Sequence, residues 1–143
     1  MMKRLGQLAR LPAAERADLV EALALCTVVS IGLRVLRFSA VAPRLGRHMA
    51  ESPAHHAGAT SGEVARVQWA IATAARYLPW KPVCLPQAVT AQWMLRRRGI
   101  SSTLYLGADP ASGYDAHAWV RVGGVIVTGG PDQDRFAVVS TFA

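Results

Sequence analysis

The sequence has little cysteine, little acid and few aromatic side chains. Only two of the 143 residues are cysteine, Cys26 and Cys84, which excludes a disulfide-rich scaffold and a zinc ribbon. Nine acidic residues stand against 16 Lys+Arg, and the net charge of +7 favours acidic partners: an acidic peptide, an anionic membrane surface or nucleic acid. Aromatic residues make up 7% of the chain while alanine contributes 25 residues, so we expect a core of many small side chains. The hydrophobic fraction of 52% argues against disorder as the dominant state.

Long apolar runs are also missing. The longest, Ala22 to Leu33, would rise about 18 Å as a helix, which is short of the roughly 30 Å hydrocarbon layer of a bilayer. Asp18 and Glu21 precede this run, and Arg34 and Arg37 follow it. We therefore predict a buried core helix, with a membrane-associated helix as the alternative. Charges also interrupt any early apolar segment of a secretory signal, so we expect a cytoplasmic protein, with peripheral membrane contact left open.

The chain has two textures, helical to about residue 98 and strand-like from residue 103. The predicted helices, from their apolar spacing and end signals, run from Leu11-Pro12 to about Arg37, over 62–77 behind a Ser61 cap, and from Cys84 to a Gly99 stop. In the first of them the apolar positions that recur near helical spacing are Leu19, Val20, Leu23, Val28, Ile31 and Val35. Arginines 96–98 are interpreted as a solvated last helical turn.

Strand-like segments follow at 103–106, 116–122 and 125–128, and a further one is predicted at 136–139. Gly123-Gly124 between the second and third is a two-residue hairpin signal. We predict one α+β domain, 1–143, with helices in the first two-thirds and an antiparallel sheet in the last third. Within it, 1–60 forms a helical region and 61–143 the core.

One cysteine and one histidine stand where acyl-transfer chemistry needs them. Cys84, in PWKPVCLPQA, opens a helix, and the free N–H groups and positive dipole at a helix start stabilise a thiolate. His117, in DAHAWVRV, opens a strand, and an imidazole can activate the thiol. Alone, each residue type is more often structural, and Cys26, in mid-helix, is interpreted as a small buried hydrophobe. The combination is that of papain-like and transglutaminase-like enzymes.

Two segments, CLPQAVTAQWMLRRRGISSTLYLG and AHAWVRVGGVIVTGG, resemble the lasso-peptide leader peptidases, which are transglutaminase-like cysteine proteases. The resemblance covers about residues 79 to 142 and extends to the N-terminal half only in texture. It implies a papain-like or transglutaminase-like fold, and an enzyme that removes the leader from a ribosomally made precursor peptide before macrocyclisation. By matching motif, Cys84 would be the nucleophile and His117 the general base, with no cofactor and no metal.

The resemblance also implies partners. Its standalone form lacks a fused recognition domain, and the N-terminal half here shows no strands from which to build one. We therefore expect a separate leader-recognition protein besides the precursor peptide, with a lasso cyclase as a further partner. A helical surface including Arg34 and Arg37 is our predicted docking face for the recognition protein. Nucleic acid is not expected, because no recognition motif accompanies the positive charge.

The third catalytic group is predicted from hairpin register. Thr128-Gly129-Gly130 stands where a carboxylate on the second hairpin strand would be convenient. With Gly123-Gly124 as the turn, His117 falls opposite Gly130, which has no side chain. The same-face diagonal neighbours of His117 are then residues 128 and 132. Asp132 is therefore the predicted orienting carboxylate of a Cys-His-Asp triad.

Several alternatives stay open. Asp115, Asp134 or no carboxylate at all could replace Asp132 as the orienting group. Another Cys-His acyl-transfer enzyme, such as a transglutaminase or amidase, would use the same residues, and a noncatalytic membrane-associated scaffold would need none of them. Trp80 and Trp119 beside the two motifs are assigned to packing in preference to substrate contact. Histidines 48, 55 and 56 lack partners at metal-ligand spacing, so we predict no metal site.

Overall fold

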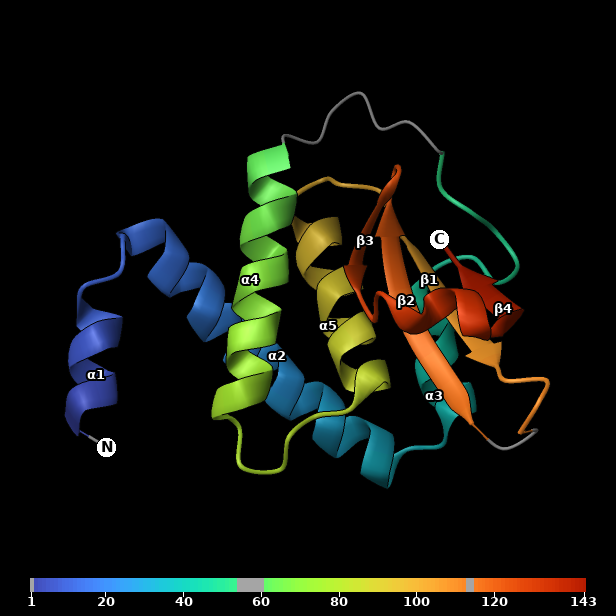
Figure 1. The fold of residues 1–143 in the computed structure, drawn as a ribbon, viewed down its shortest axis with the longest axis horizontal. Coiled ribbons are helices and arrows are strands. Elements are labelled where there is room, and N and C mark those ends of the chain that lie inside the picture. The colour runs from blue at the N-terminus through green and yellow to red at the C-terminus, as the bar shows by residue number, and fades with distance from the viewer. Residues whose placement is uncertain (1, 54–60, 113–114) are drawn as a thin grey trace.

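Helices form the first two-thirds of the chain and strands the last third (Figure 1). The computed structural model describes residues 2–53, 61–112 and 115–143, without the side chains of residues 2–5, 61 and 132. The helices are α1 (Met2–Ala9), α2 (Ala13–Val35), α3 (Phe38–Val41), the 3-10 helix η1 (Ala42–Leu45), α4 (Ser61–Tyr77) and α5 (Cys84–Arg97). The later elements are β1 (Thr103–Ala108), β2 (Ala116–Val122), β3 (Val125–Thr128), the 3-10 helix η2 (Asp132–Arg135) and β4 (Ala137–Phe142).

The predicted α+β architecture is confirmed. The four strands form an antiparallel sheet in the order β3-β2-β1-β4, and α5 packs against it. Ala118, Val120 and Val122, which alternate along β2, belong to the core that the sheet shares with α2, α4 and α5. Figure 1 shows α5 beside β2, with the N-terminal ends of both elements on the same side of the molecule. Among the described helices, none combines the length and hydropathy that crossing a lipid bilayer requires.

The β2–β3 hairpin follows the predicted turn but not the predicted register. Val122 lies opposite Val125 across Gly123-Gly124, as expected. Arg121 then pairs with Ile126 but Val120 with Thr128, so Val127 is an extra residue on β3 and forms a bulge. β3 ends at Thr128, and the register has by then moved by one residue. The predicted position of Gly130 opposite His117 is therefore wrong.

The end of α5 agrees with the prediction at its stop signal and at two of its three arginines. Gly99 has the expected left-handed conformation, with φ of 70°, directly after the cap residue Arg98. The predicted solvated turn is confirmed for Arg96 and Arg97, which are exposed, and wrong for Arg98, whose side chain is only 20% exposed and binds both Asp18 and Glu21 at 2.7 Å. Asp18 also binds Arg66 of α4 at 2.6 Å. These carboxylates on α2 bind arginines of α4 and α5, which fastens three helices together.

The buried face of α2 differs from the predicted one. The positions that it buries are Asp18, Leu19, Ala22, Cys26, Val29 and Ser30. Of the six apolar positions singled out in the sequence only Leu19 is buried, whereas Val20, Val28, Ile31 and Val35 are all more than half exposed. The error has a physical cause. Apolar residues occur on nearly every side of α2, so the hydrophobic pattern does not determine which side faces the core.

Candidate active site

Cys84 is the first residue of α5, as predicted. Its side chain is half-buried and packs against the core. Val83, the residue before it, has extended backbone angles and no side chain that can accept a hydrogen bond from the first turn of the helix. A thiolate at residue 84 therefore lies beside backbone N–H groups that have no side-chain cap. Together with the helix dipole, these groups make the start of α5 a favourable place for negative charge. Cys26, by contrast, is fully buried inside α2.

His117 is the second residue of β2, and its ring is held by a backbone group. Its Nε2 lies 2.5 Å from the carbonyl oxygen of Gly129. A carbonyl oxygen only accepts hydrogen bonds, so Nε2 must carry the hydrogen and donate it. The neutral ring then has its lone pair on Nδ1. This bond fixes the tautomer and leaves Nδ1 as the basic nitrogen.

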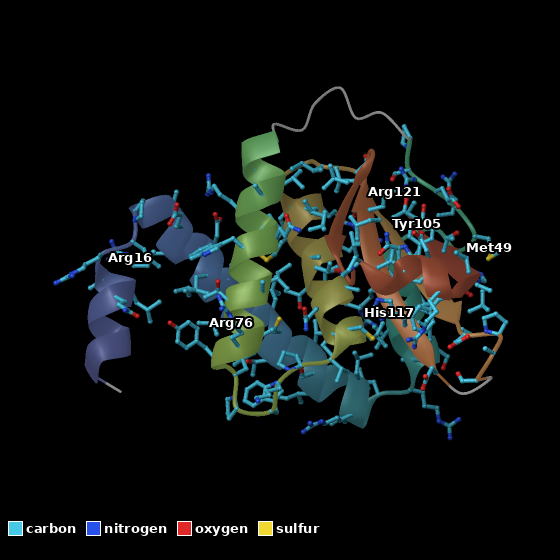
Figure 2. All side chains as sticks on the ribbon, in the orientation of Figure 1. Arg16, Met49, Arg76, Tyr105, His117 and Arg121 are labelled. Atoms are coloured by element: carbon cyan, nitrogen blue, oxygen red, sulfur yellow. The ribbon has the colours of Figure 1, made fainter. Side chains whose placement is uncertain are left out.

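Aromatic rings hold the plane of the same imidazole. His117 stacks on Phe136, with ring centroids 4.9 Å apart, and on Trp119, at 5.9 Å. Trp119 stacks in turn on Tyr105 at 5.3 Å and is only 5% exposed, which confirms its assignment to packing. Figure 2 shows Tyr105, His117 and Arg121 over the sheet, with Arg16 and Arg76 among the helices at the other end of the molecule. The imidazole is thus positioned by stacking and by one hydrogen bond.

Two glycines make room for this arrangement, and sequence reasoning assigned neither of them that role. A Cβ on Gly129, whose φ is +84°, would lie 2.5 Å from the carbonyl oxygen of Ala118. A Cβ on Gly107, which pairs with His117 across the sheet, would lie 2.8 Å from Trp119 and from the Cβ of Phe136. In the sequence, the Thr128-Gly129-Gly130 segment stands out only because it lacks a carboxylate. In the structure, the carbonyl of its first glycine, Gly129, contacts His117.

The candidate nucleophile and base lie on elements that pack together. No hydrogen bond joins the Cys84 sulfur to His117 in the part of the chain that the structure describes. The alternation of β2 directs Ala118 and Val120 toward the helical layer, and His117 stacks with Trp119 on the alternate positions. The described structure therefore does not bring the two side chains together, and their catalytic pairing stays a prediction.

The carboxylates considered as the third group fall in three places. Asp132 begins η2, and its side chain lies outside the described residues. Asp115 is 63% exposed and lies 3.7 Å from Arg135, an ion pair at the surface. Asp134 is exposed. In the described structure, the Gly129 carbonyl contacts Nε2 of His117. The assignment of Asp132 as the orienting carboxylate stays a prediction.

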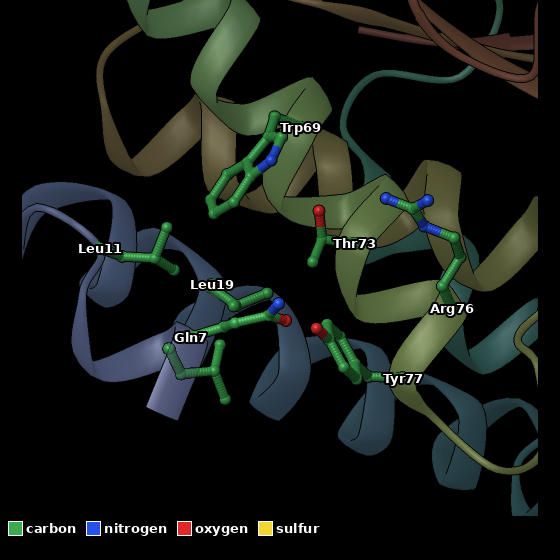
Figure 3. Close-up of a pocket in the computed structure, with 8 residues that line it drawn as sticks. Gln7, Leu11, Leu19, Trp69, Thr73, Arg76 and Tyr77 are labelled. Atoms are coloured by element: carbon green, nitrogen blue, oxygen red, sulfur yellow. The ribbon is translucent and has the colours of Figure 1, made fainter. Parts of the chain in front are cut away.

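One cavity lies next to Cys84, and another lies far from it. The near one, about 250 Å³, is lined by Trp80 and by Val83 and Leu85, the chain neighbours of Cys84. Trp80 is 39% exposed there, more than its assignment to packing predicts. The far one, about 430 Å³, lies between α1, α2 and α4, with Trp69 and Tyr77 among its walls (Figure 3). Of these two cavities, the near one adjoins the candidate nucleophile.

The described histidine outside the candidate active site is His48. His48 lies 3.4 Å from the Ser140 hydroxyl and contacts the Phe142 ring. Within residues 2–53, 61–112 and 115–143, no three His, Cys, Asp or Glu side chains come close enough to hold a metal ion. His55 and His56 lie outside the described residues.

A cysteine at a helix start, packed against a sheet that carries a histidine, defines a Cys-His acyl-transfer class of fold. The family model described as the transglutaminase-like superfamily matches residues 23–141. The chain belongs to this superfamily, which supports a general Cys-His acyl-transfer activity of the cysteine-protease type. No curated protein and no solved structure matches the chain.

Proposed function

We propose that this protein is a cysteine peptidase that removes the leader from a ribosomally made lasso precursor peptide before macrocyclisation. The observation that carries the proposal is the positioned imidazole of His117. Its ring plane is held by Phe136 and Trp119, and its Nε2 is held by the Gly129 carbonyl. Family membership and the place of Cys84 at the start of α5 supply the second half of the site. The choice of a lasso precursor is supported by the resemblance of the two motifs.

The proposed reaction divides between the two side chains. Nδ1 of His117 takes the thiol proton of Cys84, and the thiolate sulfur attacks the carbonyl carbon of the scissile peptide bond. The imidazolium returns the proton to the leaving amine as the C–N bond breaks, which leaves the leader as a thioester on Cys84. Water, deprotonated by His117, then hydrolyses the thioester and releases the leader as a carboxylate. The freed amine is the group that a cyclase joins to a side-chain carboxylate.

Oxyanion stabilisation falls to the backbone in this proposal. The N–H of Cys84 stands at the start of α5, where the positive end of the helix dipole favours a developing negative charge. Asp132 remains our proposed source of a carboxylate for the imidazolium. The Gly129 carbonyl already accepts a hydrogen bond from Nε2 of His117. We therefore propose that Asp132 contributes a smaller part of the stabilisation of the imidazolium.

The proposed reaction takes place in the cytoplasm, where a ribosomal precursor is made, and a separate recognition protein presents the leader. A second protein that binds both leader and peptidase would raise the effective concentration of the scissile bond at Cys84. The excess of basic residues, 16 against 9 acidic, supports an acidic surface on at least one partner.

The test is mass spectrometry of a candidate precursor incubated with this protein, with and without a candidate recognition protein. We expect cleavage at one bond, a large increase when the recognition protein is present, and none with the Cys84→Ala variant. Adding a primary amine separates hydrolysis from transamidation. Amine incorporated into the leader in preference to water would replace the peptidase with a transglutaminase. An unchanged precursor in every reaction would overturn the proposal.

A further inference from the structure

The outer side of α2 presents a continuous apolar strip to solvent. Its members recur at helical spacing of three or four residues and are all exposed: Ala13, Ala17, Val20, Ala24, Val28, Ile31 and Val35. We call these residues the α2 outer face. The four branched residues among them are between 57% and 77% exposed. The strip covers the whole of α2, whose 23 residues span roughly 35 Å.

Among the described residues, four of the thirteen large apolar side chains that are exposed belong to α2, and all four lie on this strip. Single exposed apolar residues are normal on a protein surface, but a contiguous strip of this length is typical of an interaction site. A groove adjoins it, lined by Ala17, Val20 and Ala24 of α2 and by Arg97 at the end of α5. The α2 outer face therefore has a concave border that a second element can occupy.

The two edges of the strip differ in charge: Glu21 and Arg97 form an ion pair beside the groove, and the charges on the other edge are positive. Asp18 and Glu21, two of the acids of α2, bind Arg66, Arg97 and Arg98 of the neighbouring helices. Arg16 and Arg34 lie along one edge of the strip and are exposed. Within the part of the chain that the structure describes, neither forms an ion pair with an acid. The strip thus has a basic edge whose complement is acidic.

We propose that the α2 outer face docks an amphipathic helix of another protein, with an apolar side against the strip and acidic residues facing Arg16 and Arg34. The inference goes beyond the proposed peptidase activity and does not depend on it. A helix suits a strip of this length and width, because recognition of this kind uses apolar side chains at the same spacing of three and four residues.

The composition of the strip favours a protein over a lipid surface. Ala13, Ala17 and Ala24 let a partner backbone come close, and interaxial distances between packed helices depend on such side chains. Helices that lie in a membrane interface instead carry Trp, Phe and Leu on the apolar side, and the strip has none of these.

Charge disfavours a second copy of this chain as the occupant. In a two-fold antiparallel pair, the same edge of each helix faces its counterpart on the other copy. The Arg16 and Arg34 edge would then meet its own positive charges, and like charges across an interface weaken it. An acidic partner removes the same cost.

The test uses the full chain with Cys84→Ala, so that binding is measured apart from activity. Two fluorescent synthetic helical peptides share the same Leu and Ala side and differ only in having Glu or Lys along its edge. Anisotropy titrations at low salt should show binding of the Glu peptide and not of the Lys peptide. Arg16→Glu with Arg34→Glu should weaken the Glu peptide by about tenfold or more and allow the Lys peptide to bind.

A second pair of variants tests the apolar strip. Val20→Glu with Ile31→Glu should abolish binding of the Glu peptide, while Val139→Glu, an equally exposed valine on β4, should not. Circular dichroism checks that each variant is folded. No binding of the Glu peptide, or equal binding of both peptides, would overturn the proposal. Two further results would overturn it. One is that the protein binds vesicles of phosphatidylcholine and phosphatidylglycerol and that Val20→Glu with Ile31→Glu alone abolishes this binding. The other is that the protein dimerises in sedimentation and that the same variant alone is monomeric.

Discussion

The two cysteines place the same side chain in two different regions of the molecule. Cys26 lies in the middle of α2, has no exposed surface, and has a thiol whose pKa is raised by burial, against a smaller lowering by a hydrogen bond with Thr90. Cys84 is half-buried at the first position of α5, beside the free N–H groups of the helix start. Because the residue type is the same, the position within a helix is the reason that we expect one thiol to pack and the other to react. Substitutions around Cys84 should therefore change activity, and those around Cys26 should change stability.

The largest expected effect is that of Cys84→Ala. Removing a nucleophile that acts together with its base should lower the cleavage rate by at least about 10³-fold and leave the urea unfolding curve unchanged. Cys26→Ala is the matched control and should keep near-normal cleavage. The direct comparison is alkylation by iodoacetamide at mildly acidic pH, followed by peptide mapping. Label on Cys26 in preference to Cys84 in the folded protein would contradict the distinction between the two regions.

The next largest effect should come from Gly129→Ala. A Cβ there would meet the Ala118 carbonyl oxygen at 2.5 Å, on a backbone with φ of +84°, so the carbonyl that holds His117 must move. A displacement of about 1 Å in a positioning group can cost about 10²-fold in rate. The rate of precursor cleavage, followed by mass spectrometry, measures this loss. Gly124→Ala, whose Cβ has nothing within 4 Å, is the control and should behave as wild type.

A smaller loss is expected for Asp132→Asn. If the Asp132 carboxylate stabilises the imidazolium, its removal should lower the cleavage rate by about tenfold, less than Gly129→Ala, since the carbonyl keeps the ring oriented. Asp115→Asn and Asp134→Asn should be silent. Wild-type rates for all three variants would make the backbone carbonyl the sole orienting group. If Asp134→Asn abolished cleavage and Asp132→Asn had no effect, Asp134 and not Asp132 would be the orienting carboxylate.

In the other region, Asp18→Ala should change stability and not chemistry. Its carboxylate is 5% exposed and binds Arg66 and Arg98, so its removal leaves two guanidinium groups without this partner. Hydrogen bonds to charged groups contribute roughly 1.5–3 kcal/mol, and we expect a loss of about 2 kcal/mol in the free energy of unfolding. Cleavage at a temperature where the variant is folded should be normal. Loss of activity without loss of stability would break the division between the two regions.

The smallest effect should appear at Cys26 in alkaline solution. Burial raises the pKa of this thiol above its ordinary value of 9.0. Above about pH 9 the unfolded chain loses this proton while the folded chain retains it, so stability falls as pH rises. Urea unfolding between pH 8 and pH 10.5 should show wild type losing more stability than Cys26→Ala. Parallel curves for the two proteins would show that ionisation of Cys26 is not linked to folding.

The sequence by itself determined the local ends of the elements. Pro12 preceding α2, the start of α5 at Cys84, the stop at Gly99 and the turn at Gly123-Gly124 all lie where residue chemistry predicts. These features depend on the backbone freedom of a few neighbouring residues, and no distant contact opposes them. The α+β order and the place of Cys84 and His117 at element starts follow from the same local preferences.

Only the tertiary structure decided which surfaces meet. The buried side of α2 is set by Asp18 binding Arg66 and Arg98 and by the packing of α4 and α5, because the helix is apolar on nearly every side. The bulge at Val127 places that residue and Thr128 in buried positions, and this moves the register away from the one that the turn alone implies. The Gly129 carbonyl then reaches His117 through space, a role invisible in a sequence because every residue has a carbonyl. Packing therefore decides between arrangements that the local sequence pattern does not distinguish.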